Sequence, residues 1–483
     1  MPLQLTLDCL KEIFECLEED KATLFSCLLV NRIWCRISVI ILWRQIWDVS
    51  KLNDTLIACL PNESKEFLLK NGIIISTPTS KPPLFNYPSF CKILSISQII
   101  NRQIIFTGSK NHKISLMTQE ILKMFMKQNS SLKELIYDLN YYEYKIMNYP
   151  KFVNFLEFPG ARDYLKNISR LLCSSNVYPG FFYQLSQICH NIQSLNIECE
   201  KSIPIGLVDL INSQNNLKCF SLKRLPEYGQ YDEYVSDVYT AEILPSLTNH
   251  SDTLKTLHLH GEVNYDSSSF ITKFTNLQEL DLSLEYENAE YFKELQYHTF
   301  PHLKSLHFNC PKVEILINFL KINGKTLNNF YVDKYDESLY FAIAKYCPNL
   351  KSLDIVVCEG ESLKAIFTNC IQLESMYVEL YYSGKELLEI VARYSPKNFH
   401  ELNFTSYNTE ILPDDYESFF TSWKDRVPLK SISFRISDVM SYSDEENEEI
   451  MEKYKSLGVI KDFNYISYYY MNMTGFLVFP LLY

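Results

Sequence analysis

A short apolar pattern, L-x-x-L-x-L, recurs about a dozen times between residues 91 and 434, mostly at intervals of 23 to 26 residues. In each copy the alternation of apolar and polar residues predicts a short strand with one face in a core. No unit of this length can bury its apolar face alone, so the fixed period predicts a stack of many such units. The clearest copies are Leu254/Leu257/Leu259, Leu277/Leu280/Leu282, Leu303/Leu306/Phe308, Leu327/Phe330/Val332, Leu350/Leu353/Ile355 and Leu373/Met376/Val378.

The alternative to strands is a series of amphipathic helices, because apolar residues three apart also suit a helix face. The fixed period argues against helices, and so do turn-forming residues such as Asn276, Pro301 and Pro348 that open several copies. We therefore expect an α/β solenoid, the leucine-rich-repeat horseshoe, over residues 90–483 with a C-terminal cap. Weaker copies complete the series: Cys91/Leu94/Ile96, Leu132/Leu135/Tyr137, Ile168/Leu171/Cys173, Ile192/Leu195/Ile197, Leu217/Phe220/Leu222, Phe399/Leu402/Phe404 and Leu429/Ile432/Phe434.

Composition favours binding over catalysis. The chain is 47% apolar and 14% aromatic, which predicts a packed protein, and its net charge of -12 disfavours a nucleic-acid partner. It has only 12 glycines and contains none of the P-loop, dinucleotide-binding, nucleophile-elbow or H-E-x-x-H motifs. We expect no enzyme activity, no catalytic residue and no cofactor.

The cysteines and the apolar stretches indicate the cellular compartment of the protein. The 14 cysteines form no C-x-x-C pair and several fall at core positions, so we expect reduced thiols in the cytoplasm, the nucleus or both. The N-terminus has no basic region followed by an apolar run, so no secretory signal is expected. The apolar stretches 24–43 and 466–483 are interrupted by polar residues and proline, so we expect no membrane span.

The first 48 residues have apolar residues at helical spacing and predict two or three short helices. Asp20 is placed to cap the second helix, beside an acidic turn. A unit of about 45 residues cannot bury this much apolar surface by itself, so part of its face must meet another surface, either its own solenoid or a second protein. Two apolar stripes are expected, Leu10, Ile13, Phe14 and Leu17 in one, Leu24, Cys27, Leu28 and Val30 in the other.

Residues 3–48 resemble an F-box, the module that binds a Skp-type adaptor in Skp/cullin/F-box ubiquitin ligases. The family pattern usually opens with Leu-Pro, whereas Thr6 follows Leu5 here. A leucine-rich solenoid after the module is a second, independent match to the F-box/leucine-rich-repeat class. The landmarks are Leu5, Leu10, Ile13-Phe14, Leu17, Leu24, Cys27, Val30, Arg32-x-Trp34 and Leu42-Trp43.

The resemblance implies a substrate-recognition subunit of a ubiquitin ligase. The module would bind the adaptor and through it a cullin, while the solenoid would bind a protein substrate for ubiquitylation and subsequent degradation. The alternative is a leucine-rich-repeat interaction scaffold, outside any ligase, in which the N-terminal helices only cap the solenoid. The residues implied in adaptor binding are Leu5, Leu10, Ile13, Phe14, Leu17, Val30, Trp34 and Trp43.

Between the two units, residues 49–89 predict a connector that is partly helical and then proline-rich. It is either a loop packed over the first repeat or a spacer between ligase arm and substrate. Tyrosine-rich residues 226–239 form an insertion that either shapes a binding face or is a plain surface loop. The acidic run 441–455 predicts a solvated helix face.

The strand period of two lets individual substrate-binding candidates be named on the concave face. Acidic residues outnumber basic ones there, so we expect a protein partner with a basic surface; loops at the solenoid edge are the alternative site. The row His258, Asp281 and His307 resembles a metal-ligand set, but outward strand positions are polar by default, so no metal is expected. The candidates are His258, Asp281, His307, Tyr331, Asp354, Tyr377 and Glu379.

Overall fold

The computed structural model describes most of the chain, and its contacts divide it into two units, residues 1–253 and 254–483. The described residues are 6–45, 50–75, 83–107, 111–128, 132–138, 153–199, 204–224, 240–260, 268–283, 293–309, 312–332, 334–356, 360–380, 384–406, 411–438 and 445–467.

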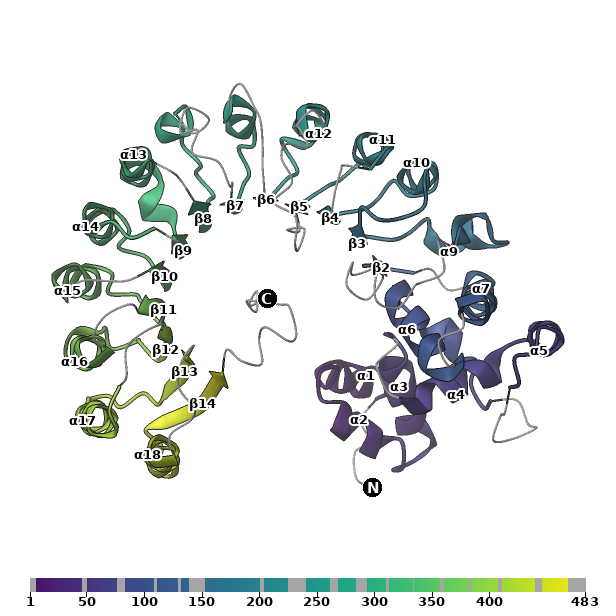
Figure 1. The fold of residues 1–483 in the computed structure, drawn as a ribbon, viewed down its shortest axis with the longest axis horizontal. Coiled ribbons are helices and arrows are strands. Elements are labelled where there is room, and N and C mark those ends of the chain that lie inside the picture. Colours follow the sequence, from purple (N-terminus) through teal and green to yellow (C-terminus); the bar gives the residue numbers. More distant parts are fainter. Residues whose placement is uncertain are drawn as a thin grey trace. The chain divides into compact units, whose positions relative to one another are not determined.

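The first unit begins with a module of three helices, α1 (Leu7–Glu15), α2 (Lys21–Cys27) and α3 (Arg32–Leu42) (Figure 1). Each helix starts at a residue whose side chain accepts backbone N–H groups of the first turn. Thr6 accepts from Cys9, the predicted cap Asp20 accepts from Thr23 at 3.0 Å, and Asn31 accepts from two N–H groups of α3. The predicted start of the second helix is confirmed.

The remainder of the first unit alternates helices with strands that pair in parallel and in chain order. The strands are β1 (Ile93–Ser95), β2 (Glu134–Tyr137), β3 (Arg170–Ser174), β4 (Ser194–Cys199) and β5 (Cys219–Arg224). The helices are α4 (Ser50–Cys59), α5 (Asn62–Lys70), η1 (Tyr87–Phe90), α6 (Ile96–Thr107), α7 (Asn111–Met126), η2 (Phe155–Glu157), α9 (Ala161–Leu165), α10 (Phe181–Ser186), α11 (Leu207–Asn212), α12 (Thr240–Leu247) and η3 (Thr248–His250).

The second unit repeats the same plan, with strands β6 to β14 in parallel pairs and helices on one side of them (Figure 1). Its strands are β6 (Thr256–His260), β7 (Glu279–Ser283), β8 (Ser305–Asn309), β9 (Asn329–Val332), β10 (Ser352–Val356), β11 (Ser375–Leu380), β12 (Glu401–Ser406), β13 (Ile432–Asp438) and β14 (Ile460–Ser467). Its helices are η4 (Ser268–Lys273), η6 (Leu295–Tyr297), α13 (Val313–Asn323), η7 (Gly324–Thr326), α14 (Glu337–Tyr346), α15 (Gly360–Asn369), α16 (Gly384–Tyr394), α17 (Pro413–Lys424) and α18 (Glu445–Ser456).

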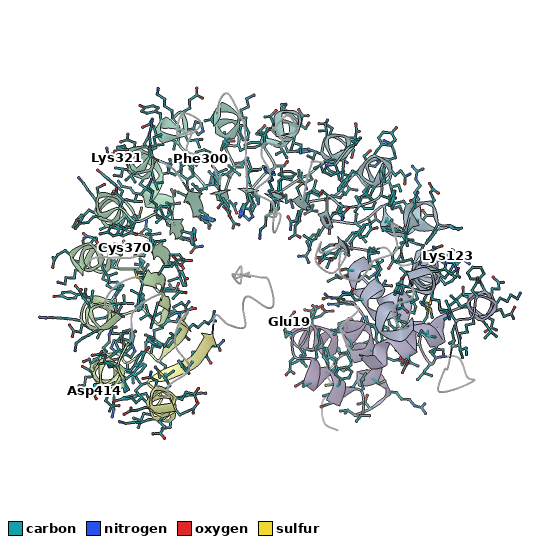
Figure 2. All side chains as sticks on the ribbon, viewed as in Figure 1. Glu19, Lys123, Phe300, Lys321, Cys370 and Asp414 are labelled. Atoms are coloured by element: carbon teal, nitrogen blue, oxygen red, sulfur yellow. The ribbon has the colours of Figure 1, made fainter. Side chains whose placement is uncertain are left out.

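The strand register confirms the repeat pattern read from the sequence. Leu257 pairs with Leu280, Leu280 with Leu306, and Leu306 with Phe330, and all of these side chains are buried. The core of each unit lies between strands and helices, as at the buried Phe300 and Cys370 in Figure 2, while Lys321 on α13 is exposed. Both units are therefore parts of an α/β solenoid.

A recurring backbone contact joins successive repeats just before most of the described strands. One carbonyl accepts the N–H groups of two consecutive residues in the next repeat; for example, Lys255 accepts from Gln278 at 2.7 Å and from Glu279 at 3.0 Å. The same contact joins the helical module to the first repeat, since the Arg44 carbonyl accepts from Lys92 at 2.7 Å and Ile93 at 2.9 Å. The backbone after α3 thus meets β1 as one repeat meets another.

The last predicted repeat has a different register from the one expected. The sequence pattern aligned Phe434 with Phe404, but in the structure Phe434 pairs with Leu402 and Ile436 pairs with Phe404. The core positions of β13 are thus Phe434 and Ile436, two residues later than predicted. A proline-containing turn after α17 separates the pattern residues, so spacing alone did not fix the alignment.

The connector and the acidic run take up ordered structure where they are described. Residues 50–70 form α4 and α5, and Tyr87 of η1 packs on Trp43 of the helical module with ring centroids 4.5 Å apart. The acidic run forms α18, with Met451 and Tyr454 buried and its acidic side chains outward. Leu5 and the insertion 226–239 lie outside the described residues.

No helix in the described part of the chain is long and apolar enough to cross a membrane. Every cysteine among the described residues has a free thiol. Burial raises the pKa of the Cys91 and Cys370 thiols to about 12, so these side chains act as small apolar groups of the core.

Candidate functional site

The helical module exposes several large apolar side chains. Ile13 is 47% exposed, Val30 57% and Leu29 89%. Isolated exposed apolar residues are ordinary, but this many on a module of about 40 residues is typical of a protein-binding surface. The exposed apolar side chains are Leu7, Ile13, Phe25, Leu29, Val30, Ile33 and Ile40.

The predicted adaptor-binding residues divide into three groups. Ile13 and Val30 are exposed, and Leu10, Leu17 and Trp34 are half-buried. Phe14 and Trp43 are 1% and 6% exposed and therefore offer no surface to a partner in this structure. Leu5 lies outside the described residues.

Contacts between α1 and α3 hold the module together. The Phe14 ring of α1 meets the Trp34 ring of α3 edge-on, with centroids 5.1 Å apart. Arg44 forms a bidentate ion pair with Glu15 and reaches Glu18 at 3.2 Å, which connects the end of α3 to α1. The hydrogen bond from Arg44 lowers the pKa of Glu15. These contacts between α1 and α3 fix the positions of the helices that carry the exposed apolar side chains.

The second candidate surface is the helix-free face of the sheet in the second unit, formed by outward residues of β6 to β13 (Figure 1). The sequence-predicted row is confirmed as a register row: His258 pairs with Asp281, Asp281 with His307, His307 with Tyr331, Tyr331 with Asp354, and Asp354 with Tyr377. The C-terminal end of the row is Asn403 followed by Arg435, whereas the sequence copy Leu429/Ile432/Phe434 predicts Ser433, between Ile432 and Phe434, at that place.

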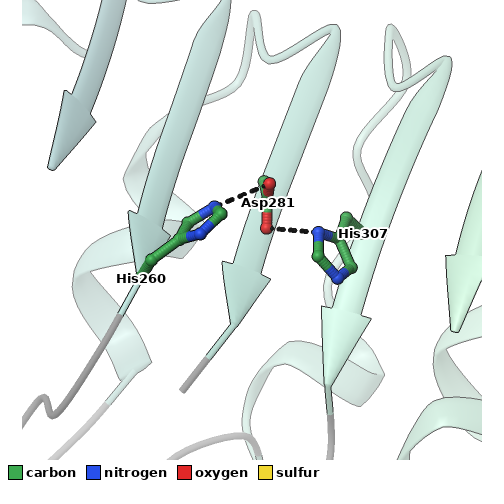
Figure 3. Close-up of side chains that lie close together, drawn as sticks. All are labelled: His260, Asp281 and His307. Atoms are coloured by element: carbon green, nitrogen blue, oxygen red, sulfur yellow. Dashed lines mark hydrogen bonds and ion pairs between the residues drawn. The ribbon is translucent and has the colours of Figure 1, made fainter. Parts of the chain in front are cut away.

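The structure brings two members of this row, Asp281 and His307, together with His260, which lies two positions after His258 on β6; the three residues come from β6, β7 and β8 (Figure 3). His260 Nε2 lies 2.7 Å from Asp281 Oδ2, and His307 Nδ1 lies 2.8 Å from Asp281 Oδ1. The predicted neighbour His258 is only 7% exposed and lies instead near Glu279, at 3.2 Å. The carboxylate therefore bridges His260 and His307.

This bridge changes the charge expected of the surface. Burial alone would raise the pKa of Asp281, but hydrogen bonds from His260 and His307 together hold it well below its usual range. Asp281 is therefore ionised and already paired within the chain. The acidic excess that favoured a basic partner therefore loses this residue.

Two tyrosines flank Asp354 on the same face. The Tyr331 ring packs edge-on against His307 with centroids 4.0 Å apart, and the Tyr377 hydroxyl lies 2.8 Å from the Thr405 hydroxyl. Both rings are half-buried, which leaves part of each accessible to a partner. Half-buried tyrosines fixed by their neighbours lose little entropy on binding and suit an interface.

The Asp354 carboxyl should make stability fall as pH rises. Burial raises its pKa to about 7, partly opposed by the charge of His307 and the backbone N–H of Tyr377, while Glu401 adds to the rise. In the unfolded chain the value is about 3.9. The folded state therefore binds this proton more tightly, so the contribution of Asp354 is most favourable below about pH 4 and is lost between pH 4 and 7.

We expect Asp354→Asn to raise the free energy of unfolding by about 1–2 kcal/mol at pH 8 and to change it little at pH 4, because the amide cannot ionise. Denaturant unfolding at both pH values measures this. The matched change Asp281→Asn removes an ionised, hydrogen-bonded carboxylate, so it should have the opposite sign at pH 8. A stability loss in both variants at pH 8 would contradict the prediction.

Sequence reasoning missed His260 and Ser283 as members of this cluster. Ser283 Oγ lies 3.3 Å from Asp281 Oδ1 and 3.2 Å from His307 Nε2. Both residues stand in the second outward column, two positions after the row of Asp281. The period of two places both His258 and His260 on the outward face, because they are two residues apart on one strand. Which of the two histidines contacts the Asp281 carboxylate depends on the directions of their side chains.

The fold and these surfaces define the class of the chain as an α/β solenoid of stacked repeats with an N-terminal helical module. No protein-family model matches the sequence, and no curated protein is significantly similar to it. The chain is similar to the yeast Rad7 and Elc1 complex structure at 14% identity and a TM-score of 0.40, over 72% of this chain and 84% of that chain. It is also similar to a leucine-rich-repeat protein of Leptospira interrogans at 14% identity and a TM-score of 0.27, over 71% of this chain and 91% of that one.

Proposed function

We propose that this chain is the substrate-recognition subunit of a Skp/cullin/F-box-type ubiquitin ligase. The observation that carries the proposal is the exposed apolar surface of the three-helix module, in residues that resemble an F-box. The adaptor would bind Ile13 and Val30 directly, with Leu10, Leu17 and Trp34 at the edge of the contact. Phe14 and Trp43 would support this surface from inside.

The solenoid would hold a protein substrate so that its lysines lie near the ubiquitin-loaded partner of the cullin. The rate gain in such an assembly comes from proximity, because binding raises the local concentration of reacting groups. The chain itself would contribute no nucleophile, general base or cofactor to ubiquitin transfer. Its role would be to position the substrate.

The test is capture of a purified Skp-type adaptor by the full chain, followed by assembly with a cullin. The proposal expects a complex with one adaptor per chain on gel filtration. A folded chain that binds no such adaptor would favour a scaffold without ligase function. That second candidate has its own support, because the Arg44 carbonyl joins the module to β1 as a cap is joined to a repeat array.

For the substrate, we expect the paired change Tyr331→Ala and Tyr377→Ala to reduce capture at least tenfold, since half-buried aromatic side chains contribute strongly to interfaces. Quantitative mass spectrometry of proteins ubiquitylated with and without the chain identifies substrates, and pull-down of one of them measures the change. The control pair is Tyr183→Ala and Tyr297→Ala, whose side chains are 54% and 72% exposed outside this face. Unchanged capture by the Tyr331/Tyr377 variant would move the site to the solenoid edge.

A further inference from the structure

The cluster of His260, Asp281 and His307 has the donor set of a metal site. One imidazole nitrogen from each histidine and one carboxylate oxygen lie within 4.8 Å of one another. They stand on three adjacent parallel strands, and Figure 3 shows both rings turned toward the carboxylate between them. We propose that these three residues bind a divalent transition-metal ion, with Zn²⁺ the best fit.

The fit to Zn²⁺ follows from ligand type and reach. Zinc takes imidazole nitrogen and carboxylate oxygen with bonds of about 2.1 Å, which places ligand atoms about 3.4 Å apart in a tetrahedral site. The nitrogens lie 2.7 and 2.8 Å from Asp281 oxygens, and all three ligand atoms lie within 4.8 Å of one another, so side-chain rotations are what the cluster needs to reach that geometry while the strands stay in register. Mg²⁺ and Ca²⁺ prefer all-oxygen sites, which this cluster does not offer.

The surroundings orient the ligands. Ser283 Oγ lies 3.2 Å from Nε2 and 3.4 Å from Nδ1 of His307, so the hydroxyl contacts the imidazole edge next to the metal-facing nitrogen. The Tyr331 ring packs edge-on against the same imidazole at 4.0 Å and restricts its rotation. The side chains are 27%, 15% and 26% exposed for His260, Asp281 and His307, which leaves a route for an ion.

Three protein ligands leave the fourth tetrahedral position for a water molecule or for a side chain of a bound partner. The metal would connect the side chains of β6, β7 and β8, which pair with one another through backbone hydrogen bonds in the sheet. The competing interpretation is a metal-free ion-pair network in which Asp281 simply accepts from both histidines. The two interpretations differ in a measurable way, because only the first gives a stoichiometric, ligand-specific metal.

The experiment uses the full chain, treated with a chelator and dialysed, then titrated with ZnCl₂ in a calorimeter. We expect about one Zn²⁺ per chain at this site, and at least a tenfold loss of affinity in His260→Gln and His307→Gln. His190→Gln, a change at an exposed histidine of the first unit, should leave binding unchanged. Circular dichroism and thermal unfolding of metal-free samples establish that each variant remains folded.

Because the chain has 14 cysteines, Co²⁺ substitution identifies the ligands independently. Nitrogen and oxygen ligation gives tetrahedral visible bands without thiolate-to-cobalt charge transfer, and these bands should disappear in His260→Gln. A thiolate band, or zinc binding that survives the double change His260→Gln and His307→Gln, would overturn the assignment. Absence of any stoichiometric binding to the unmodified chain would establish the ion-pair network instead. The test is independent of adaptor binding.

Discussion

The double change Ile13→Ala and Val30→Ala is expected to weaken adaptor binding at least a hundredfold while leaving the solenoid folded. Ile13 and Val30 are 47% and 57% exposed, so removing their side chains costs the fold less packing than removing a buried side chain. At an interface hot spot, each such contact typically contributes about 2 kcal/mol or more. Titration of a purified Skp-type adaptor by calorimetry measures the loss.

The matched control is Leu69→Ala with Ile74→Ala, two apolar side chains that are 61% and 78% exposed outside the module. This pair removes comparable apolar surface and should leave adaptor binding unchanged. Phe14→Ala serves a different purpose, since it removes a core ring and is expected to unfold the module. Equal affinities for the Ile13/Val30 variant and the unmodified chain would exclude the proposed adaptor face.

Replacing Trp423 by alanine is expected to lower the free energy of unfolding by about 3–5 kcal/mol, the range for removal of a buried aromatic side chain. Trp423 on α17 is 1% exposed and packs beside Phe399 and Phe419, with ring centroids 6.3 and 5.6 Å away. The Arg426 guanidinium lies 4.1 Å from its ring centroid. Its indole N–H donates to the Lys430 carbonyl at 2.9 Å.

Urea unfolding followed by circular dichroism measures this loss. Trp423→Phe keeps most of the ring packing and removes only the 2.9 Å hydrogen bond, so it should cost about 1 kcal/mol. Ser418→Ala, on the same helix but exposed, controls for a general effect on α17. If Trp423→Ala and Ser418→Ala were equally stable, the packing around α17 would not support the last repeats as described.

The strands of the repeats were largely predictable from the sequence. Each L-x-x-L-x-L copy combines local alternation with a fixed interval, so both strand phase and strand order follow without long-range information. Leu257, Leu280 and Leu306 are buried and in register as expected. The pattern failed at β13, where an interval of different length let the alignment shift by two residues and keep the same face.

The sequence predicted which surfaces carry the candidate sites, but not which of their residues contact one another. The outward phase of His258, Asp281, His307, Tyr331 and Asp354 follows from the period of two, because successive side chains of a strand point to opposite faces. Helical spacing likewise indicated which residues of the N-terminal module are apolar and periodic. It could not divide them between core and surface, since a helical stripe is wide enough to serve both.

The sequence by itself determined the repeat architecture, the helical character of the module and the composition of the helix-free face, because all three depend on local periodicity. Tertiary structure decided that Phe14 is covered by Trp34, that Ile13 and Val30 stay exposed, and that His260 rather than His258 meets Asp281. These outcomes depend on side-chain rotamers and on contacts between residues distant in the chain. Spacing along a single sequence does not encode them.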